Sequence, residues 1–406
     1  MIANIKRSVL CGTVSAPPSK SMAHRLLIAG GLSTGKSVVH GISPSEDVLA
    51  TLDCLKAIGA EWNYDGDTVE IIGADVAKSN EEKRELFCRE SGSTLRFFIP
   101  LCLIGGNDTY LYGSEKLLSR PLEIYENICR KQGIEYSPRK DSIRIKGRLS
   151  SGNFKIAGNI SSQFISGLLF ALPLLDGDSI IDIVPPIESC SYIKLTILAL
   201  SKFGVKIEWL DDRTLFVKGS QSYEPREVWV EGDYSNAAFF DALNYLGSNV
   251  TVENLDPNSI QGDRVYKTYF DMMVRGTPTL SISDCPDLGP VLFAVAAARN
   301  GGIFSGTRRL KIKESDRGAA MAQELSKFGT SVTVEDDGII VYPTGFSAPT
   351  ECLYGHNDHR IVMSLSILLT VTGGTLYGAE AVNKSMPDFF EKMKAIGMEV
   401  ELIDDK

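Results

Sequence analysis

The sequence predicts an α/β protein built from six copies of one strand–helix–strand–helix–hairpin unit. Two series of glycines predict this repeat. The first series closes the turn between an apolar helix and a short β-rich run, at positions 35, 106, 177, 247, 302 and 374. The second ends amphipathic helices, where glycine adopts the left-handed conformation easily, at positions 59, 133, 204, 276, 329 and 397. Both series recur about every 71 residues with one short interval at the same place, which is typical of a repeat architecture.

Each unit is predicted to contain two kinds of helix. The apolar helices are expected over 21–35, 93–106, 162–177, 235–247, 287–302 and 358–374. Amphipathic helices that end in glycine are expected over, for example, 52–59, 125–133 and 324–329. A strand–turn–strand pattern follows at 61–63, 65–66 and 68–72, where Asp-Gly is a strong hairpin signal.

Six such units in 406 residues could form a solenoid or two compact domains of three units each. The polar segment 220–227, which contains Pro225, falls between the third and fourth units and is the predicted hinge. Pro17 and Pro18 form a second stiff segment near the N-terminus.

The composition excludes several classes of protein. Apolar residues make up 43% and charged residues 23%, and the net charge is −9, which does not favour disorder or general nucleic-acid binding. No apolar run is long enough for a membrane helix, and residues 1–11 do not form a signal peptide, so we expect a cytoplasmic protein without a membrane partner. The eight cysteines form no Cys-x-x-Cys pair, and His356 and His359 form no zinc pattern, so we expect no metal.

Basic residues near the starts of the apolar helices suggest an anion site. Lys20, Arg25, Arg96 and Arg360 lie where a positive charge opposes the helix dipole at a cost of about 0.3–1 kcal/mol each. A bound anion would reverse the sign of this effect. We therefore expect several helix starts to converge on one polyanionic site, although Ser235 and Asp358 are also explained as N-caps.

Three further segments carry charge at predicted helix starts. Residues 311–317 hold five charges in seven positions, and Lys384 precedes another helix start. A solvated charged turn explains the first segment equally well. Asp287 opens a very apolar helix, so it is either a cap or a base in a cleft.

Residues 30–37 match the Walker A pattern letter for letter. That motif binds phosphate only after a strand and before a helix. Here an expected helix comes first and an expected strand follows, so a P-loop kinase is an alternative that the motif order does not favour.

Ten ordered motifs resemble one family, 5-enolpyruvylshikimate-3-phosphate (EPSP) synthase. They cover about 370 residues of the chain and include Pro18-Ser19-Lys20-Ser21, Ser91-Gly92-Ser93-Thr94, Arg120-Pro121, Ser161-Ser162-Gln163-Phe164, Tyr192-Ile193, Glu231-Gly232-Asp233, Pro286-Asp287-Leu288, Lys313-Glu314-Ser315-Asp316-Arg317, Asn357-Asp358-His359-Arg360 and Lys384 before Pro387-Asp388. No single motif would be specific, but their order is.

The resemblance implies a two-domain inside-out α/β barrel of six βαβαββ units, three per domain, with a two-stranded hinge. It implies one domain over residues 15–226, which binds shikimate 3-phosphate, and a second over 1–14 and 227–406, with the active site in the cleft between them. The implied reaction transfers the enolpyruvyl group of phosphoenolpyruvate to the 5-hydroxyl of shikimate 3-phosphate. It proceeds by addition and elimination through a tetrahedral intermediate and releases phosphate in chorismate biosynthesis. No cofactor is implied, and we expect a monomer.

The resemblance also implies roles for individual residues. Those that would hold shikimate 3-phosphate are Lys20, Ser21, Arg25, Ser161, Ser162, Gln163, Ser189, Tyr192, Asp287 and Lys313. Those that would hold phosphoenolpyruvate are Lys20, Gly92, Arg120, Gln163, Arg317, Arg360 and Lys384. Asp287 would take the proton of the 5-hydroxyl, and Glu314, with Lys20 near by, would deliver and remove the proton at the methylene carbon.

The chain departs from the family pattern at three places. Glu90 stands where many members carry Asn, Ser93 where many carry Thr, and Arg308-Arg309-Leu310 replaces an Asn-containing segment of some members. A carboxylate at position 90 is expected to alter the affinity for phosphoenolpyruvate and for glyphosate, the family's herbicide ligand.

Two alternatives remain beside this family. UDP-N-acetylglucosamine enolpyruvyl transferase shares the fold but would show Lys-Asn in place of Lys20-Ser21 and a reactive loop cysteine. A noncatalytic anion-binding module would gain nothing from Asp287 and Glu314 among its cations.

Overall fold

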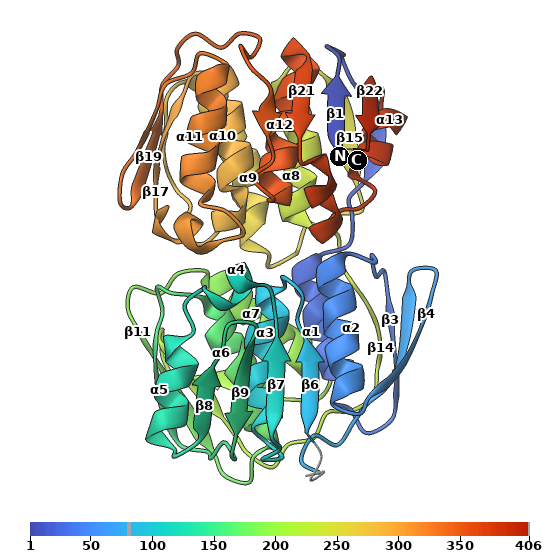
Figure 1. Ribbon diagram of the computed structural model, residues 1–406, viewed down its shortest axis with the longest axis vertical. Helices are drawn as coiled ribbons and strands as arrows, with labels where there is room; N and C mark the ends of the chain where they lie inside the picture. Colours follow the sequence, from blue (N-terminus) through green and yellow to red (C-terminus); the bar gives the residue numbers. More distant parts are fainter. Residues whose placement is uncertain (79–82, 405–406) are drawn as a thin grey trace. The chain divides into compact units, whose positions relative to one another are not determined.

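The structure is a computed structural model that describes residues 1–78 and 83–404. The chain forms two compact units (Figure 1). Unit 1 comprises Met1–Pro17 and Gly232–Lys406, and unit 2 comprises Pro18–Glu231. Each unit has its own hydrophobic core. No helix within the described ranges is both long and apolar enough to cross a membrane.

The described residues of unit 2 form three four-stranded sheets. Their strand orders are β14 (Glu227–Trp229)-β3 (Lys36–His40)-β5 (Thr68–Ile72)-β4 (Glu61–Asp65), β6 (Arg84–Phe87)-β7 (Thr109–Tyr112)-β9 (Ser142–Lys146)-β8 (Glu135–Pro138) and β10 (Asn153–Ala157)-β11 (Ser179–Val184)-β13 (Thr214–Val217)-β12 (Ile207–Trp209). In each sheet the first two strands are parallel and the last two form an antiparallel hairpin. The three sheets are therefore copies of one βαβαββ unit, as the glycine series predicted.

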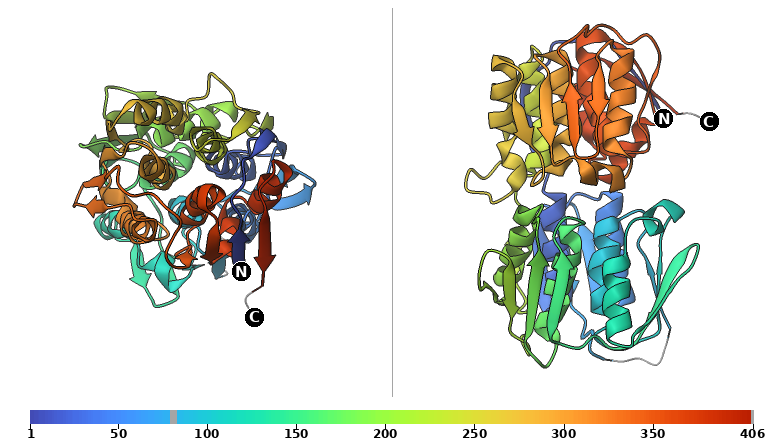
Figure 2. Two further views of the ribbon diagram at one scale, coloured as in Figure 1. Left: turned by 90° about the horizontal axis from the view of Figure 1, so that it is seen from above. Right: turned by 90° about the vertical axis from the view of Figure 1, so that its left-hand side faces the viewer.

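The helices of unit 2 fall into two classes, as expected. The apolar helices α1 (Lys20–Gly31), α3 (Gly92–Cys102) and α6 (Ser162–Ala171) are buried on nearly every face. The amphipathic helices α2 (Glu46–Ala57), α5 (Glu123–Lys131) and α7 (Cys190–Lys202) each keep an exposed face, and α4 (Glu115–Leu118) and a 3-10 turn (Leu172–Leu174) are short. Figure 2 shows the apolar helices inside the unit with strands around them. Helix starts are thus held rigidly by the core.

Unit 1 repeats this plan with two four-stranded sheets. They are β20 (Leu353–Tyr354)-β21 (Gly374–Tyr377)-β1 (Ile2–Ile5)-β22 (Val400–Ile403) and β16 (Thr279–Ser281)-β17 (Gly302–Ser305)-β19 (Gly338–Val341)-β18 (Val332–Val334). The apolar helices are α8 (Tyr234–Tyr245), α10 (Gly289–Ala298) and α12 (His359–Thr372), and the amphipathic ones are α9 (Tyr266–Arg275), α11 (Arg317–Lys327) and α13 (Phe389–Ala395). Four 3-10 turns cover Gly262–Val265, Pro286–Leu288, Arg308–Ile312 and Ala379–Lys384.

The fourth repeat along the chain is shorter than the others. Its sheet has two strands within the described ranges, β15 (Asn249–Glu253) parallel to β2 (Cys11–Ser15), without a hairpin. The chain passes directly from α9 to β16, the first strand of the next unit. The missing hairpin accounts for the one short interval in both glycine series.

The domain boundaries lie a few residues beyond the predicted positions 14/15 and 226/227. Ala16 N donates to Glu253 O at 2.9 Å, which keeps residues 15 and 16 in unit 1. Strand β14 pairs with β3, so residues 227–231 belong to unit 2. The predicted hinge at 220–227 was placed too early, because Tyr223 is buried in unit 2 and forms a bridge with Ser33.

Candidate active site

Serines cap the starts of the three apolar helices of unit 2. Ser19, Ser91 and Ser161 accept from backbone N–H groups in the first turns of α1, α3 and α6. Ser189 precedes α7 in a left-handed conformation, with φ of 55°. A neutral serine cap leaves the positive end of the helix dipole uncompensated by charge. Lys20 is the first residue of α1, whereas Arg25 and Arg96 lie in the second turns of their helices, one turn later than the dipole argument assumed.

Arg25 is a buried anchor that joins three helices. Its Nε donates to Thr196 Oγ1 at 2.8 Å, its Nη1 to Ser21 O at 2.6 Å and its Nη2 to Tyr192 O at 3.1 Å. The guanidinium also lies over the Phe97 and Tyr192 rings. Burial lowers its pKa to about 10, so the side chain stays charged at neutral pH. Ser21 and Tyr192, both predicted site residues, are thereby brought to one place.

A second group of predicted residues surrounds Gly92 at the start of α3. Arg96 Nη1 donates to Gln163 Oε1 at 2.8 Å, and Gln163 Nε2 donates to Ser93 Oγ at 3.0 Å. A Cβ built on Gly92 would lie 2.9 Å from Arg120 Nη1 and 3.0 Å from Arg96 Nη1. The absence of a side chain at Gly92 therefore lets two guanidinium groups approach a helix N-terminus, which is a favourable geometry for an anion.

The guanidinium of Arg120, which approaches Gly92, has an N–H group that donates to no protein acceptor in the described part of the chain. Its Nε has no hydrogen-bond partner within the described ranges, although the atom is buried. An unsatisfied buried donor costs about 1–3 kcal/mol, which a bound acceptor would recover. Lys20 lies on α1 and pairs with Asp47 of α2, with Nζ 2.9 Å from Oδ2.

Unit 1 holds a network of cations and carboxylates centred on Asp287. The Asp287 carboxylate accepts from Lys313 Nζ at 3.1 Å, Arg317 Nη1 at 2.8 Å and Arg360 Nη2 at 3.2 Å. Asp287 lies in the 3-10 turn before α10 and caps neither element. Burial would raise its pKa, but Arg360, Lys313 and Arg317 outweigh burial and hold that pKa well below its usual range.

Arg317 organises the carboxylates of this network. Its Nη2 donates to Glu314 Oε2 at 2.7 Å and its Nε to Asp358 Oδ2 at 2.9 Å, and only 1% of the side chain is exposed. Burial opposes its charge, yet Asp358, Glu314 and Asp287 raise its pKa above the ordinary value. Asp358 is also the N-cap of α12, as predicted from its place before that helix.

The loop before α12 places Arg360 and Lys384. Lys384 Nζ donates to Asn357 O at 2.8 Å, and both His356 and Asn357 adopt positive φ, 50° and 53°. Buried Glu324 of α11 fixes this loop, because it accepts from His356 Nε2 at 2.8 Å and from Tyr354 N at 3.0 Å. The four predicted cations of unit 1 (Lys313, Arg317, Arg360 and Lys384) are therefore held by three carboxylates and a strained loop.

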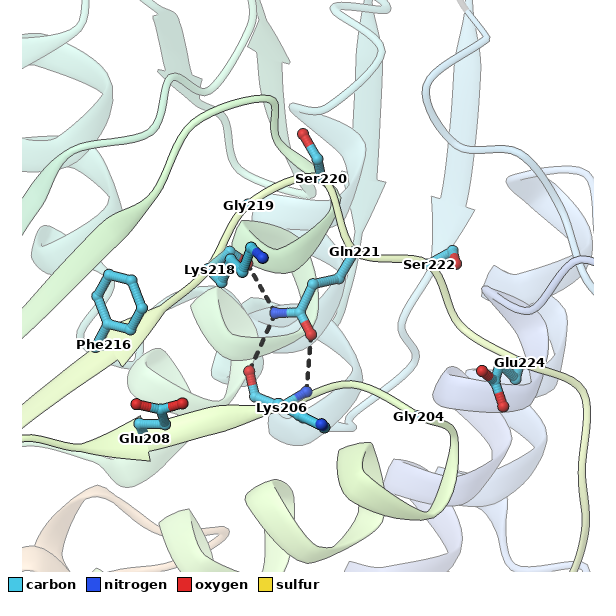
Figure 3. Close-up of a pocket in the computed structure, with 10 residues that line it drawn as sticks. All are labelled: Gly204, Lys206, Glu208, Phe216, Lys218, Gly219, Ser220, Gln221, Ser222 and Glu224. Carbon is cyan, nitrogen blue, oxygen red and sulfur yellow. Dashed lines mark hydrogen bonds between the residues drawn. The ribbon is translucent and has the colours of Figure 1, made fainter.

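Sequence reasoning missed the groups that hold these cations. Asp47, Thr196 and Glu324 lie on amphipathic helices, outside the motifs that the sequence singled out. A surface pocket of about 470 Å³ in unit 2 contains none of the predicted residues (Figure 3). Its Gln221 side chain bonds to Lys206 and Lys218 backbone atoms and closes a loop. The described residues include no group of three His, Cys, Asp or Glu side chains arranged to hold a metal ion.

The P-loop alternative is wrong. The segment that matches Walker A runs from the end of α1 to the start of β3, so helix precedes strand. Lys36 lies in that strand and pairs with Glu70 at 2.7 Å.

Comparison with known proteins decides the family. The family model described as EPSP synthase (3-phosphoshikimate 1-carboxyvinyltransferase) matches residues 5–393. The chain belongs to the EPSP synthase family. A Clostridium perfringens 3-phosphoshikimate 1-carboxyvinyltransferase is 42% identical over 97% of each chain, and one from Clostridium novyi is 38% identical over 96% of each.

Solved structures share the EPSP synthase fold. An EPSP synthase from Acinetobacter baumannii has a TM-score of 0.78 at 23% identity and covers 99% of each chain. The enolpyruvyl transferase NikO from Streptomyces tendae has a TM-score of 0.76 at 14% identity over 98% of each. These identities show the fold alone, and they confirm the predicted repeat of βα units.

Proposed function

We propose that the protein transfers the enolpyruvyl group of phosphoenolpyruvate to the 5-hydroxyl of shikimate 3-phosphate and releases phosphate. Membership of the EPSP synthase family supports this reaction. The structural observation that supports this reaction is the set of ion pairs around Asp287. Its carboxylate lies among Lys313, Arg317 and Arg360. Two substrates with two phosphates and two carboxylates need such cations in number.

In this proposal, residues of unit 2 bind the anionic groups of both substrates. Shikimate 3-phosphate would be held by the helix starts that Arg25 joins, with Ser21, Ser161, Ser162, Gln163, Ser189 and Tyr192. Phosphoenolpyruvate would contact the backbone of Gly92 and the guanidinium of Arg120, whose Nε needs an acceptor. Lys20 would reach both substrates.

Residues of unit 1 supply cations and the proton-transfer groups. Arg360, Lys384 and Arg317 would bind phosphoenolpyruvate, and Lys313 would bind both substrates. Arg317 already donates to three carboxylates, so its contribution would include holding Asp287 and Glu314 in place. We place active-site groups in both units, so neither unit is expected to act alone.

The chemistry follows from these charges. Asp287 accepts the 5-hydroxyl proton as the hydroxyl oxygen attacks the substituted carbon of phosphoenolpyruvate. Glu314, which must enter this step as the carboxylic acid, protonates the methylene carbon and becomes a carboxylate. The tetrahedral adduct then loses phosphate while Glu314 or Lys20 removes a methyl proton. A carboxylate surrounded by cations is a weak base. Substrate anions that share Lys313 and Arg360 would weaken the hold of these cations on Asp287 and strengthen it as a base.

The test is phosphate release from phosphoenolpyruvate, with mass spectrometry of the organic product and no added metal or ATP. Release that requires shikimate 3-phosphate, yields the enolpyruvyl ether and disappears in Lys20→Ala supports the proposal. A UDP-N-acetylglucosamine acceptor would instead give release only with that sugar nucleotide. We also propose that the protein acts in the cytoplasm as a monomer, which light scattering of the active sample would test.

A further inference from the structure

A row of four buried polar groups connects the starts of two predicted substrate-binding helices through a third helix. His24 Nδ1 lies 2.6 Å from Thr51 Oγ1, and Thr51 Oγ1 lies 2.8 Å from Thr94 Oγ1. Thr94 Oγ1 donates to Ser91 Oγ at 2.7 Å. None of the four residues is more than 1% exposed. The row therefore runs from α1 through α2 to α3.

Each group of the row donates its proton towards Ser91. Thr94 gives its only hydroxyl proton to Ser91, so it must accept from Thr51. Thr51 then has no proton left for His24 and accepts one from the imidazole. Burial, despite Asp47, lowers the pKa of His24 to about 3, which keeps the imidazole neutral. His24 therefore carries its proton on Nδ1, while its buried Nε2 has no hydrogen-bond partner within the described residues. Thr51 Oγ1 also lies 3.4 Å from Asp47 O, a second acceptor for its proton.

Both ends of the row lie beside predicted substrate contacts. His24 follows Lys20 by one helical turn on the same face of α1. Ser91 is the N-cap of α3 and directly precedes Gly92, which lies against Arg120. Thr51 itself lies on α2, one turn after Asp47, the partner of Lys20.

Packing alone does not require these hydroxyls. A valine would fill the space of Thr51 without a buried polar group. The hydrogen bonds of the row instead favour one geometry, because a shift would leave a buried donor unpaired at a cost. Arg25 holds α1 separately to α7 through Thr196. The Thr51 row is thus a distinct connection, and it joins α1 to α3.

We propose that Thr51 is a positioning residue that sets the spacing between the Lys20 end of α1 and the Gly92 end of α3. This inference rests on the proposed function. It assigns Thr51 no contact with either substrate. Thr51 affects the binding of phosphoenolpyruvate by fixing the position of Ser91 and Gly92. Arg25, and not Thr51, holds the residues that contact shikimate 3-phosphate.

The test compares Thr51→Val with Thr51→Ser in the full-length protein. We expect kcat/KM for phosphoenolpyruvate to fall about tenfold to 100-fold in Thr51→Val, as a small misplacement of binding groups does. We expect the Kd of shikimate 3-phosphate, measured by calorimetry without phosphoenolpyruvate, to change less than about twofold, because Arg25 is untouched. Thr51→Ser keeps the hydroxyl and should restore kcat/KM to within about twofold of the wild type.

Three results would overturn the inference. They are wild-type kinetics in Thr51→Val, an equal loss of affinity for both substrates, and no rescue by Thr51→Ser. If Thr51→Val does not fold, Thr94→Val breaks the row at the next position and must show the same selective loss. Failure of both variants to fold would assign the row to stability alone and would also overturn the proposal.

Two controls separate other causes. Thr330→Val makes the same substitution at a buried threonine of unit 1 whose hydroxyl has no partner in the described part of the chain, and it should leave the kinetics unchanged. An inactive wild type would count against the proposed function. An active wild type with an unaffected Thr51→Val would count against this inference only.

Discussion

Asp287 is an ion-pair partner of three cations, and we propose that it is also a reacting group. Its carboxylate accepts from three cations, and these hold its pKa well below the usual range. It is therefore ionised at working pH and ready to accept a proton. The same cations are the ones expected to bind substrate anions, so binding and base strength are coupled.

Asp287→Asn should lower kcat by about 100-fold or more, because a general base typically contributes that factor or more. The KM for phosphoenolpyruvate should not rise. The amide neutralises Lys313, Arg317 and Arg360 less than the carboxylate does, so these cations attract the anionic substrate at least as strongly. Steady-state kinetics with phosphate release as the readout measures both. Asp336→Asn is the control, because Asp336 is also paired with cations but is exposed. A loss below about tenfold in Asp287→Asn would remove the residue from the role of base.

His24 should make the protein sensitive to acid. Its folded pKa is about 3 and its ordinary value is 6.5, so the unfolded chain binds the proton first as pH falls. The stabilisation is complete above pH 6.5 and is lost as pH falls toward 3, by about 1.4 kcal/mol per pH unit. His24→Asn should therefore lose about 2 kcal/mol less unfolding free energy between pH 7 and pH 5 than the wild type. Urea unfolding at both pH values measures this, and parallel losses in the two proteins would contradict the prediction.

At the scale of helices, the two units cap their helices differently. Serines precede α1, α3, α6 and α7 of unit 2, whereas aspartates Asp233, Asp316 and Asp358 cap α8, α11 and α12 of unit 1. Serine caps preserve a positive helix end for anions. Aspartate caps neutralise it, and unit 1 accordingly presents its positive charge on Lys and Arg side chains.

Ser161→Asp tests this distinction. Aspartate caps a helix as well as serine does, so the free energy of unfolding should change by less than about 1 kcal/mol. The added charge at the start of α6 should repel a bound phosphate and raise the Kd of shikimate 3-phosphate at least about tenfold. Calorimetry measures the affinity. Ser114→Asp makes the same change at the cap of α4 in the same unit and should leave affinity unchanged. Equal effects of the two substitutions would contradict the account.

The helices and their starts could be predicted because their signals are local. Glycine ends, serine caps and apolar runs act within a few residues of each element, and the hairpin at 61–72 formed as expected. The partners of the site cations could not be predicted in this way. Arg25 meets Thr196 across 171 positions and Arg317 meets Asp358 across 41. The packing of apolar helices against amphipathic ones brings these pairs together, since Thr196 lies on α7 and Arg317 on α11.

At the scale of the whole molecule, the repeat explains how the site is distributed. In unit 2, Lys20, Arg25 and Arg96 lie in the first two turns of apolar helices. In unit 1, Arg360 lies at the start of the apolar helix α12, whereas Arg317 begins the amphipathic helix α11. The hairpin that the fourth repeat lacks and the use of β1 in the last sheet of unit 1 show that the repeat tolerates loss and exchange of strands.

The central claim is that groups of both units carry out one reaction on two substrates. The most direct measurement is the rate of phosphate release from phosphoenolpyruvate, with and without shikimate 3-phosphate, by wild type, Lys20→Ala of unit 2 and Arg360→Ala of unit 1. The account predicts release by the wild type only when both substrates are present, and a loss of at least about 100-fold in each variant. Release without shikimate 3-phosphate, or near wild-type release by either variant, would contradict it.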